Sequence, residues 1–262
     1  MSREQWWGDF SFNELELRSW SIGERSFVIQ RLVDEWKIWN IETQTELDSE
    51  IVLSDGQHID LDGDKVAGRY LEKQTATTLR VAPRLADKSV VTRPASPVTI
   101  LAGEKVKLFV TTPIWFSVTA LLQKECLIDV PFWRPSDTWF GASTIDGDIC
   151  YAKYTSARTR LEDLVMRSHR ATTPITVKNN HNKAFTINRL NVPVNFLSLY
   201  SDMEHNLWTS GISIERNHDS AHVEVHIESS DLNESSEHIQ ISDPRKASDQ
   251  GKLIRRISNL FG

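Results

Sequence analysis

Cysteine is scarce in this sequence, and its scarcity excludes one class of protein. Cys126 and Cys150 are its two cysteines among 262 residues, so a disulfide framework of the kind that staples small secreted domains cannot be built. The two positions also lie too far apart in the chain for a C-x-x-C motif. We therefore expect reduced thiols.

Long apolar runs are missing as well. The longest uncharged apolar stretch, residues 108–123, contains threonine, serine and proline and is too short to cross a bilayer as a helix. The N-terminal segment MSREQWWGDF lacks the basic-then-apolar layout of a signal peptide. These absences predict a cytoplasmic, soluble protein, and any membrane association would have to come from its surface.

Basic residues are in deficit. The chain has 30 lysines and arginines against 36 acidic residues, a formal net charge of −6, whereas nucleic-acid binders need a basic excess to neutralise phosphates. The patterns G-x-x-x-x-G-K, G-x-G-x-x-G and H-E-x-x-H are absent too. We predict no nucleic-acid partner, no cofactor and no catalytic residues, and we favour a protein that is not an enzyme.

Short segments of alternating polarity are abundant. In residues 105–110 valine and leucine alternate with lysine, and the alternation resumes at residues 114–119 after Thr-Thr-Pro, which predicts a half-buried hairpin. An asparagine-rich turn predicts a second hairpin over residues 175–187, and a third is predicted over residues 196–214. No long segment has a 3.6-residue period, so the fold class is all-β.

Prolines and a change of composition divide the chain. Pro94 and Pro97 suggest a connection, so we predict an N-terminal β unit at residues 1–92 and a C-terminal β-sandwich unit at residues 93–228, both sandwich- or barrel-like. Residues 229–251 are acidic with few apolar side chains, which predicts a disordered linker.

The closing segment, residues 252–262, has the pattern of a short amphipathic helix. Its apolar residues share one helical face, and three basic residues accompany them. Because eleven residues cannot hold a helix alone in water, we expect the segment to fold against anionic lipid, a groove on a partner protein or its own sandwich. The predicted contact residues are Leu253, Ile254, Arg255, Arg256, Ile257, Leu260 and Phe261.

Aromatic and basic residues follow one another after residue 132. Exposed tryptophans present large rings that stack on ligands, and arginine forks match carboxylate or phosphate. The alternative is that the tryptophans belong to the core and that the arginines are strand-face residues paired with Glu162 and Asp163. The predicted ligand-binding residues are Trp133, Trp139, Arg158, Arg160, Arg167, His169 and Arg170.

A metal site is a weaker hypothesis. His222, Glu224 and His226 would chelate a metal across a pleat. They alternate with Val223 and Val225, however, and this alternation favours the solvated face of a strand.

Four sequence patterns carry a resemblance to a known family. They are WFG–GDICYA at residues 139–152, HRATTPITVKN at 169–179, INRLNVPVNFLSLY at 187–200 and LWT at 207–209. They resemble domain-of-unknown-function family 432 in its proteobacterial form. The resemblance covers most of residues 6 to about 227 and implies a β-rich double-domain fold with no catalytic motif. It also hints at a membrane partner, because such genes often lie beside those of mechanosensitive channels.

Three hypotheses about function remain open. The first is a non-catalytic interaction protein, accessory to a membrane protein of the mechanosensitive-channel type, whose tail meets a membrane surface or a partner protein. The second is a carbohydrate- or anion-binding module that uses the tryptophans and arginines. The third is a metal-dependent enzyme at the histidine strand, which ranks lowest because no acid/base constellation accompanies it.

Overall fold

The structure is a computed structural model, and it is nearly all β. It describes residues 4–54, 61, 66–72, 76–122, 124–133, 135–143, 145–217, 222–228, 237–248, 252–256 and 260–261. Strand accounts for 63% of it, and the helices within the described ranges are the three-residue turns η2 (Leu161–Asp163) and η3 (Val194–Phe196). The all-β prediction is confirmed. Neither described helix has the length or apolar character that crossing a membrane requires.

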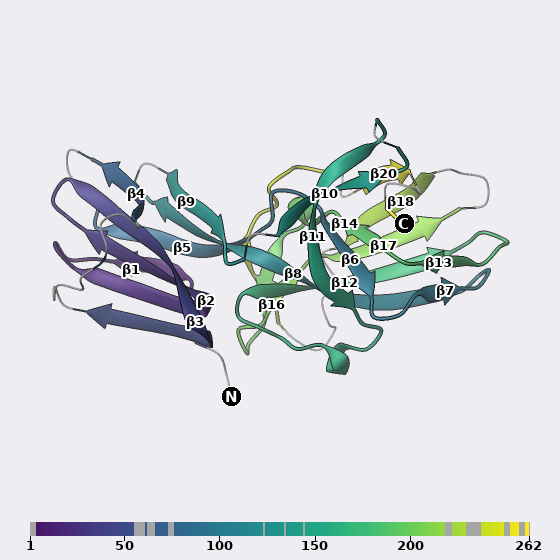
Figure 1. The fold of residues 1–262 in the computed structure, drawn as a ribbon, viewed down its shortest axis with the longest axis horizontal. Coiled ribbons are helices and arrows are strands. Elements are labelled where there is room, and N and C mark those ends of the chain that lie inside the picture. The colour runs from purple at the N-terminus through teal and green to yellow at the C-terminus, as the bar shows by residue number, and fades with distance from the viewer. Residues whose placement is uncertain are drawn as a thin grey trace. The chain divides into compact units, whose positions relative to one another are not determined.

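Strands follow one another along the described part of the chain (Figure 1). In chain order they are β1 (Gly8–Ser11), β2 (Leu17–Arg31), β3 (Glu35–Ser54), β4 (Val66–Leu71), β5 (Thr78–Leu85), β6 (Val90–Pro94), β7 (Val98–Ile100), β8 (Lys105–Ala120), β9 (Glu125–Pro131), β10 (Ser136–Gly141), β11 (Gly147–Ala157), β12 (Arg170–Asn179), β13 (Phe185–Ile187), β14 (Leu190–Val192), β15 (Leu199–Ser201), β16 (Leu207–Thr209), β17 (Gly211–Arg216), β18 (His222–Glu228), β19 (Ile239–Ser242) and β20 (Lys252–Arg256).

The contacts within the chain define two compact units. Unit 1 comprises Met1–Arg84 and Ile114–Phe132, and unit 2 comprises Leu85–Pro113 and Trp133–Gly262. This division differs from the predicted boundary between residues 92 and 93, because β8 contributes its first half to unit 2 and its second half to unit 1.

Unit 1 encloses an aromatic core. Strands β2, β3 and β4 form one antiparallel sheet, and β1, β5, β8 and β9 are hydrogen-bonded neighbours in another. Trp6, Trp20 and Trp36 are fully buried. The ring of Phe116 stacks on Phe27 with centroids 4.0 Å apart and on Trp6 at 5.9 Å. Burial of these large rings stabilises unit 1.

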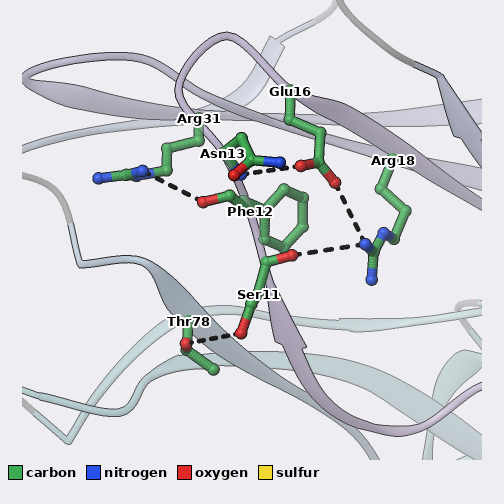
Figure 2. Close-up of polar contacts among 7 residues, drawn as sticks. All are labelled: Ser11, Phe12, Asn13, Glu16, Arg18, Arg31 and Thr78. Atoms are coloured by element: carbon green, nitrogen blue, oxygen red, sulfur yellow. Dashed lines mark hydrogen bonds and ion pairs between the residues drawn. The ribbon is translucent and has the colours of Figure 1, made fainter.

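A buried carboxylate closes the loop between β1 and β2 (Figure 2). Glu16 is 6% exposed, and its carboxylate accepts hydrogen bonds from the Asn13 amide at 2.8 Å and from Arg18 Nη2 at 3.2 Å. Arg18 and Arg31 also donate to the backbone carbonyls of residues 11 and 12, at 3.4 and 3.1 Å. We call Asn13, Glu16, Arg18 and Arg31 the Glu16 cluster; in it a buried charge meets an opposite charge.

Strand β12 is the central strand of unit 2. It pairs antiparallel with β8 and parallel with both β16 and β17. Strand β17 continues through β18 to β20, while β10, β11, β6 and β14 form a separate four-stranded sheet and β13 pairs with β7. The parallel pairs have no local sequence signal, because their strands are far apart in the chain.

The predicted hairpin over residues 105–119 is wrong, because β8 is one continuous strand. Its last pair with β12 joins Pro113 to Arg170, and its first pair with β9 joins Trp115 to Pro131. Pro113 therefore lies where the partner strand changes, a position at which a missing backbone N–H removes no ladder hydrogen bond. The Thr-Thr-Pro segment consequently continues the strand.

The predicted hairpin over residues 175–187 is also wrong, because its two strands do not pair with each other. Strand β12 ends at Asn179, but β13 pairs with β7. Asn179 is fully buried, and its Nδ2 donates to the carbonyls of Ile100, Leu101 and Lys183. Its amide thus ties the turn to residues 100–101, which leads the chain away from β12. The third predicted hairpin is confirmed over β15 and β16, which pair antiparallel, but residues 211–214 belong to β17, which pairs with β12 and β18.

The C-terminal segment is not the predicted helix where it is described. Residues Lys252–Arg256 form β20, which pairs antiparallel with β18, with Leu253 opposite Val225. The edge of β18 offers unpaired backbone groups, and a helix of this length has little stability of its own. Strand β19, which pairs with β15, likewise lies inside the range predicted as a disordered linker.

Candidate functional site

Basic side chains surround one face of β8 in unit 2. Along this strand Leu108 and Val110 are fully buried. The residues that alternate with them, Lys107, Phe109 and Thr111, belong to the opposite face because successive side chains alternate. The Lys107 ammonium lies 5.7 Å from the centroid of the Phe109 ring. This face therefore begins with a cation held over an aromatic ring.

Two arginines flank β8 on the same face. The backbone of Arg158 pairs with that of Phe109 through hydrogen bonds of 2.9 and 2.7 Å, and Arg170 lies opposite Pro113 on β12. Residues opposite each other in an antiparallel pair project to the same side, so both arginines share the face of Phe109 and Thr111. A hydrogen bond of 3.4 Å from Arg170 Nη1 to Thr111 Oγ1 agrees with this placement.

The positive charge of the Arg170 guanidinium has little compensation from its described neighbours. Its side chain is half-buried, and among the described residues its one hydrogen-bond partner is Thr111, while its Nε is buried without one. Burial lowers the pKa of Arg170 and the nearby positive charge of Arg167 lowers it further. We call Lys107, Arg158, Arg167 and Arg170, around Phe109 and Thr111, the β8 basic face.

The other basic residues predicted for the site lie differently. Arg160 is exposed, and its guanidinium is 3.5 Å from the carboxylate of Glu162, which is the pairing expected under the alternative interpretation. His169 is half-buried and precedes Arg170 in the chain. The structure thus brings Arg158, Arg167 and Arg170 to the β8 strand and leaves Arg160 in a surface ion pair.

Trp139 does not join the arginines. Trp139 is 42% exposed and lies opposite Ile149 in the β10–β11 pair. Ile149 precedes Arg158 by nine residues, and the register irregularity between Ala152 and Ser156 shortens this to about seven residues of ladder. Trp139 is therefore separated from Arg158 by roughly 23 Å along the strand. Trp133 is 48% exposed. Trp139 and the arginines are therefore separate features of unit 2.

The predicted metal residues form one face of β18. His222, Glu224 and His226 are exposed or half-buried, and Val223 and Val225 are fully buried, so the predicted strand alternation is confirmed. The His226 Nε2 atom lies 3.4 Å from the Glu224 carboxylate. Within the described ranges no three histidine, cysteine or acidic residues are grouped so that they could hold a metal ion.

The C-terminal apolar residues pack within their own unit where they are described. Leu260 and Phe261 are buried, the Leu260 carbonyl accepts a hydrogen bond from the Asn191 amide at 2.9 Å, and the Phe261 ring lies 5.3 Å from that of Phe185. Leu253 is half-buried. The predicted contacts at Ile257 and at the side chains of Ile254, Arg255 and Arg256 lie outside the described residues. An external partner stays a prediction, and burial of Leu260 and Phe261 already explains part of the apolar pattern.

Lys107 and Thr111 are site residues that the sequence interpretation missed. The alternation of residues 105–110 already put Lys107 on the outer face of its strand. What was lacking was the pairing of β8 with β12 and with Arg158, which joins residues about 50 to 60 positions apart.

Comparison with known proteins identifies the family of this chain. No curated protein and no solved structure matches the chain. Residues 6–261, nearly the whole chain, match the family described as Protein of unknown function (DUF432). The β-rich fold implied by the sequence resemblance is the fold observed here. The chain therefore belongs to the DUF432 family.

Proposed function

We propose that this protein is a binding module that takes up an anionic ligand at the β8 basic face. The observation that supports the proposal is the half-buried guanidinium of Arg170, which has Thr111 as its one hydrogen-bond partner among the described residues. The ligand class is a phosphate or carboxylate group, because both match the donors of arginine.

The energetic argument concerns the charge of Arg170. Taking a charged group out of water is unfavourable unless an opposite charge or good hydrogen bonds compensate it. The hydroxyl of Thr111 is neutral, and Arg167 adds a repulsive positive charge. An anion beside Arg170 would offset both costs, and Lys107 and Arg158 would add long-range attraction from the same face.

The test is titration of the full chain with inorganic phosphate, pyrophosphate and citrate, followed by calorimetry and by the thermal unfolding midpoint. We expect at least one of them to bind and to raise the midpoint, since a ligand that binds the native state stabilises it. Sodium chloride at matched ionic strength controls for general screening.

Two variants make the test specific. Arg170→Gln removes a charge-assisted hydrogen bond and should weaken binding by about tenfold or more. Arg160→Gln is the matched control, because Arg160 is exposed and paired with Glu162; it should change the affinity by less than about threefold. Equal binding by Arg170→Gln and the unmodified protein, or an equal effect of sodium chloride, would refute the proposal.

A further inference from the structure

The β10–β11 hairpin of unit 2 presents an aromatic side chain at the outside of its sheet. Strand β10 is the terminal strand of the order β10–β11–β6–β14. Trp139 on β10 and Ile149 on β11 lie directly opposite each other and are 42% and 58% exposed. On the other face of the hairpin Phe140 and Cys150 are buried against Val91. Trp139 is therefore excluded from that core by the alternation of its strand.

The indole ring of Trp139 is held in one orientation. Its Nε1–H donates to the Ser143 carbonyl at 2.7 Å. The ring also lies against Gly147, where an added Cβ would come within 2.9 Å of the indole Cε2 atom. Because the N–H is engaged and glycine leaves room for the ring, Trp139 offers a pre-oriented aromatic face to solvent.

Polar groups follow the indole on the same face. Asp137 lies two residues before Trp139 and opposite Tyr151, so it projects to the same side about 7 Å away. Lys88 Nζ is 2.7 Å from the Asp137 carboxylate and 4.8 Å from the centroid of the Tyr151 ring. The Tyr151 hydroxyl donates to Asp87 Oδ1 at 2.8 Å. Donors and acceptors thus lie beside the aromatic face.

We infer that this surface binds carbohydrate, with a pyranose ring stacked on Trp139 and its hydroxyl groups hydrogen-bonded to Lys88, Asp137 and Asp87. A sugar has apolar C–H faces and a polar rim, and this surface offers an aromatic plane beside closely spaced donors and acceptors. The two carboxylates disfavour the phosphates of a nucleic acid. The site is separate from the β8 basic face, because Trp139 lies opposite Ile149 near the start of β11, whereas Arg158 follows the end of β11.

Binding of cellotetraose, maltotetraose and tri-N-acetylchitotriose to the full chain tests the inference, measured by calorimetry and by the indole N–H signals in NMR spectra. We expect millimolar or tighter binding of at least one of them and a shift of the Trp139 signal. Trp139→Ala should weaken sugar binding by about tenfold or more. Trp139→Phe and Lys88→Ala should each weaken sugar binding by a smaller factor.

Trp133→Ala is the matched control, since Trp133 is a similarly exposed tryptophan outside the hairpin, and it should bind as the unmodified chain does. Retained binding in Trp139→Phe shows that a loss in Trp139→Ala reflects the missing ring and not misfolding. The inference is overturned if none of the three sugars binds at millimolar concentration, or if Trp139→Ala binds as tightly as the unmodified chain. Capture of an extended apolar peptide along β10 without any sugar binding would overturn it too.

Discussion

Each unit holds a half-buried arginine, but the two arginines differ in their surroundings. In unit 1, Arg18 lies 3.2 Å from the Glu16 carboxylate and over the rings of Phe10 and Phe12, at 5.2 and 5.1 Å. In unit 2, Arg170 contacts a hydroxyl and is repelled by Arg167. Both side chains leave Nε buried without a partner among the described residues, so the difference lies in the compensating charge.

This difference separates a structural arginine from a binding arginine. A charge that the fold itself neutralises, as in the Glu16 cluster, is costly to disrupt, because removing one partner leaves the other buried and unpaired. A charge that the fold leaves uncompensated adds little stability and persists where a ligand supplies the opposite charge. The three predictions that follow sharpen or break this comparison.

The largest effect is expected in unit 1. Glu16→Gln leaves the half-buried Arg18 without the carboxylate that neutralises it. Removing one member of such a pair should lower the free energy of unfolding by about 3 kcal/mol. Urea unfolding measures it. Glu162→Gln is the matched control, because its pair with Arg160 is exposed and should contribute less than about 1 kcal/mol. Equal effects of the two substitutions would break the comparison.

An intermediate effect is expected from pH at Asp202, another carboxylate whose hydrogen bonds are complete. Its carboxylate accepts hydrogen bonds from Trp208 Nε1 and Asn206 Nδ2 at 2.9 Å each and from the amides of Glu204 and Asn206 at 2.9 and 2.8 Å. Burial raises the pKa of Asp202, but these hydrogen bonds outweigh burial and the pKa is lowered overall.

The sign of the pH effect follows from that lowered pKa. The stabilisation is fully present above the unfolded-state pKa of about 4 and is lost as the pH falls through the lower native value. Because Asp202 is partly exposed, the loss should be on the order of 1 kcal/mol. Urea midpoints from neutral pH into the acid range measure it, and Asp202→Asn should lack this part of the pH dependence. An unchanged acid profile in Asp202→Asn would contradict the prediction.

The smallest effect on stability is expected at the β8 basic face. Arg170→Met removes an uncompensated charge and keeps a long apolar side chain, so the free energy of unfolding should change by less than about 1 kcal/mol. Arg18→Met is the corresponding substitution in unit 1. It leaves the Glu16 carboxylate buried without an opposite charge and should lower the free energy of unfolding by about 3 kcal/mol. The same urea experiment compares the two. A loss of several kcal/mol in Arg170→Met would show that Arg170 is structural.

Local pattern predicted the strands well and their partners poorly. Alternation in residues 105–110 and 222–228 correctly assigned buried and exposed faces. It failed at Pro113, where a turn signal lies inside a strand because the neighbouring strand changes. It failed again over residues 252–256, whose apolar spacing fits a helix but whose backbone completes the edge of β18.

The sequence predicts which residue types form the candidate site but not which of them lie together. Arg158 and Arg170 were identified from their residue type, yet Trp139 was assigned to the same site on the basis of nearness in sequence. Strand register decides otherwise, because each residue of strand adds about 3.3 Å and Trp139 pairs with Ile149, well before Arg158. Lys107 and Thr111 were missed because they reach the arginines through long-range pairing.

The sequence by itself determined the all-β class, the family and which side chains of most strands are apolar, because these depend on composition, motif and a two-residue period that act locally. Tertiary structure alone decided that β8 serves both units, that β12 has parallel neighbours, and that Arg170 lacks a carboxylate while Arg18 has one. These outcomes depend on hydrogen bonds and charges between residues far apart in the chain, and a short window of sequence contains no information about which distant strand will supply them.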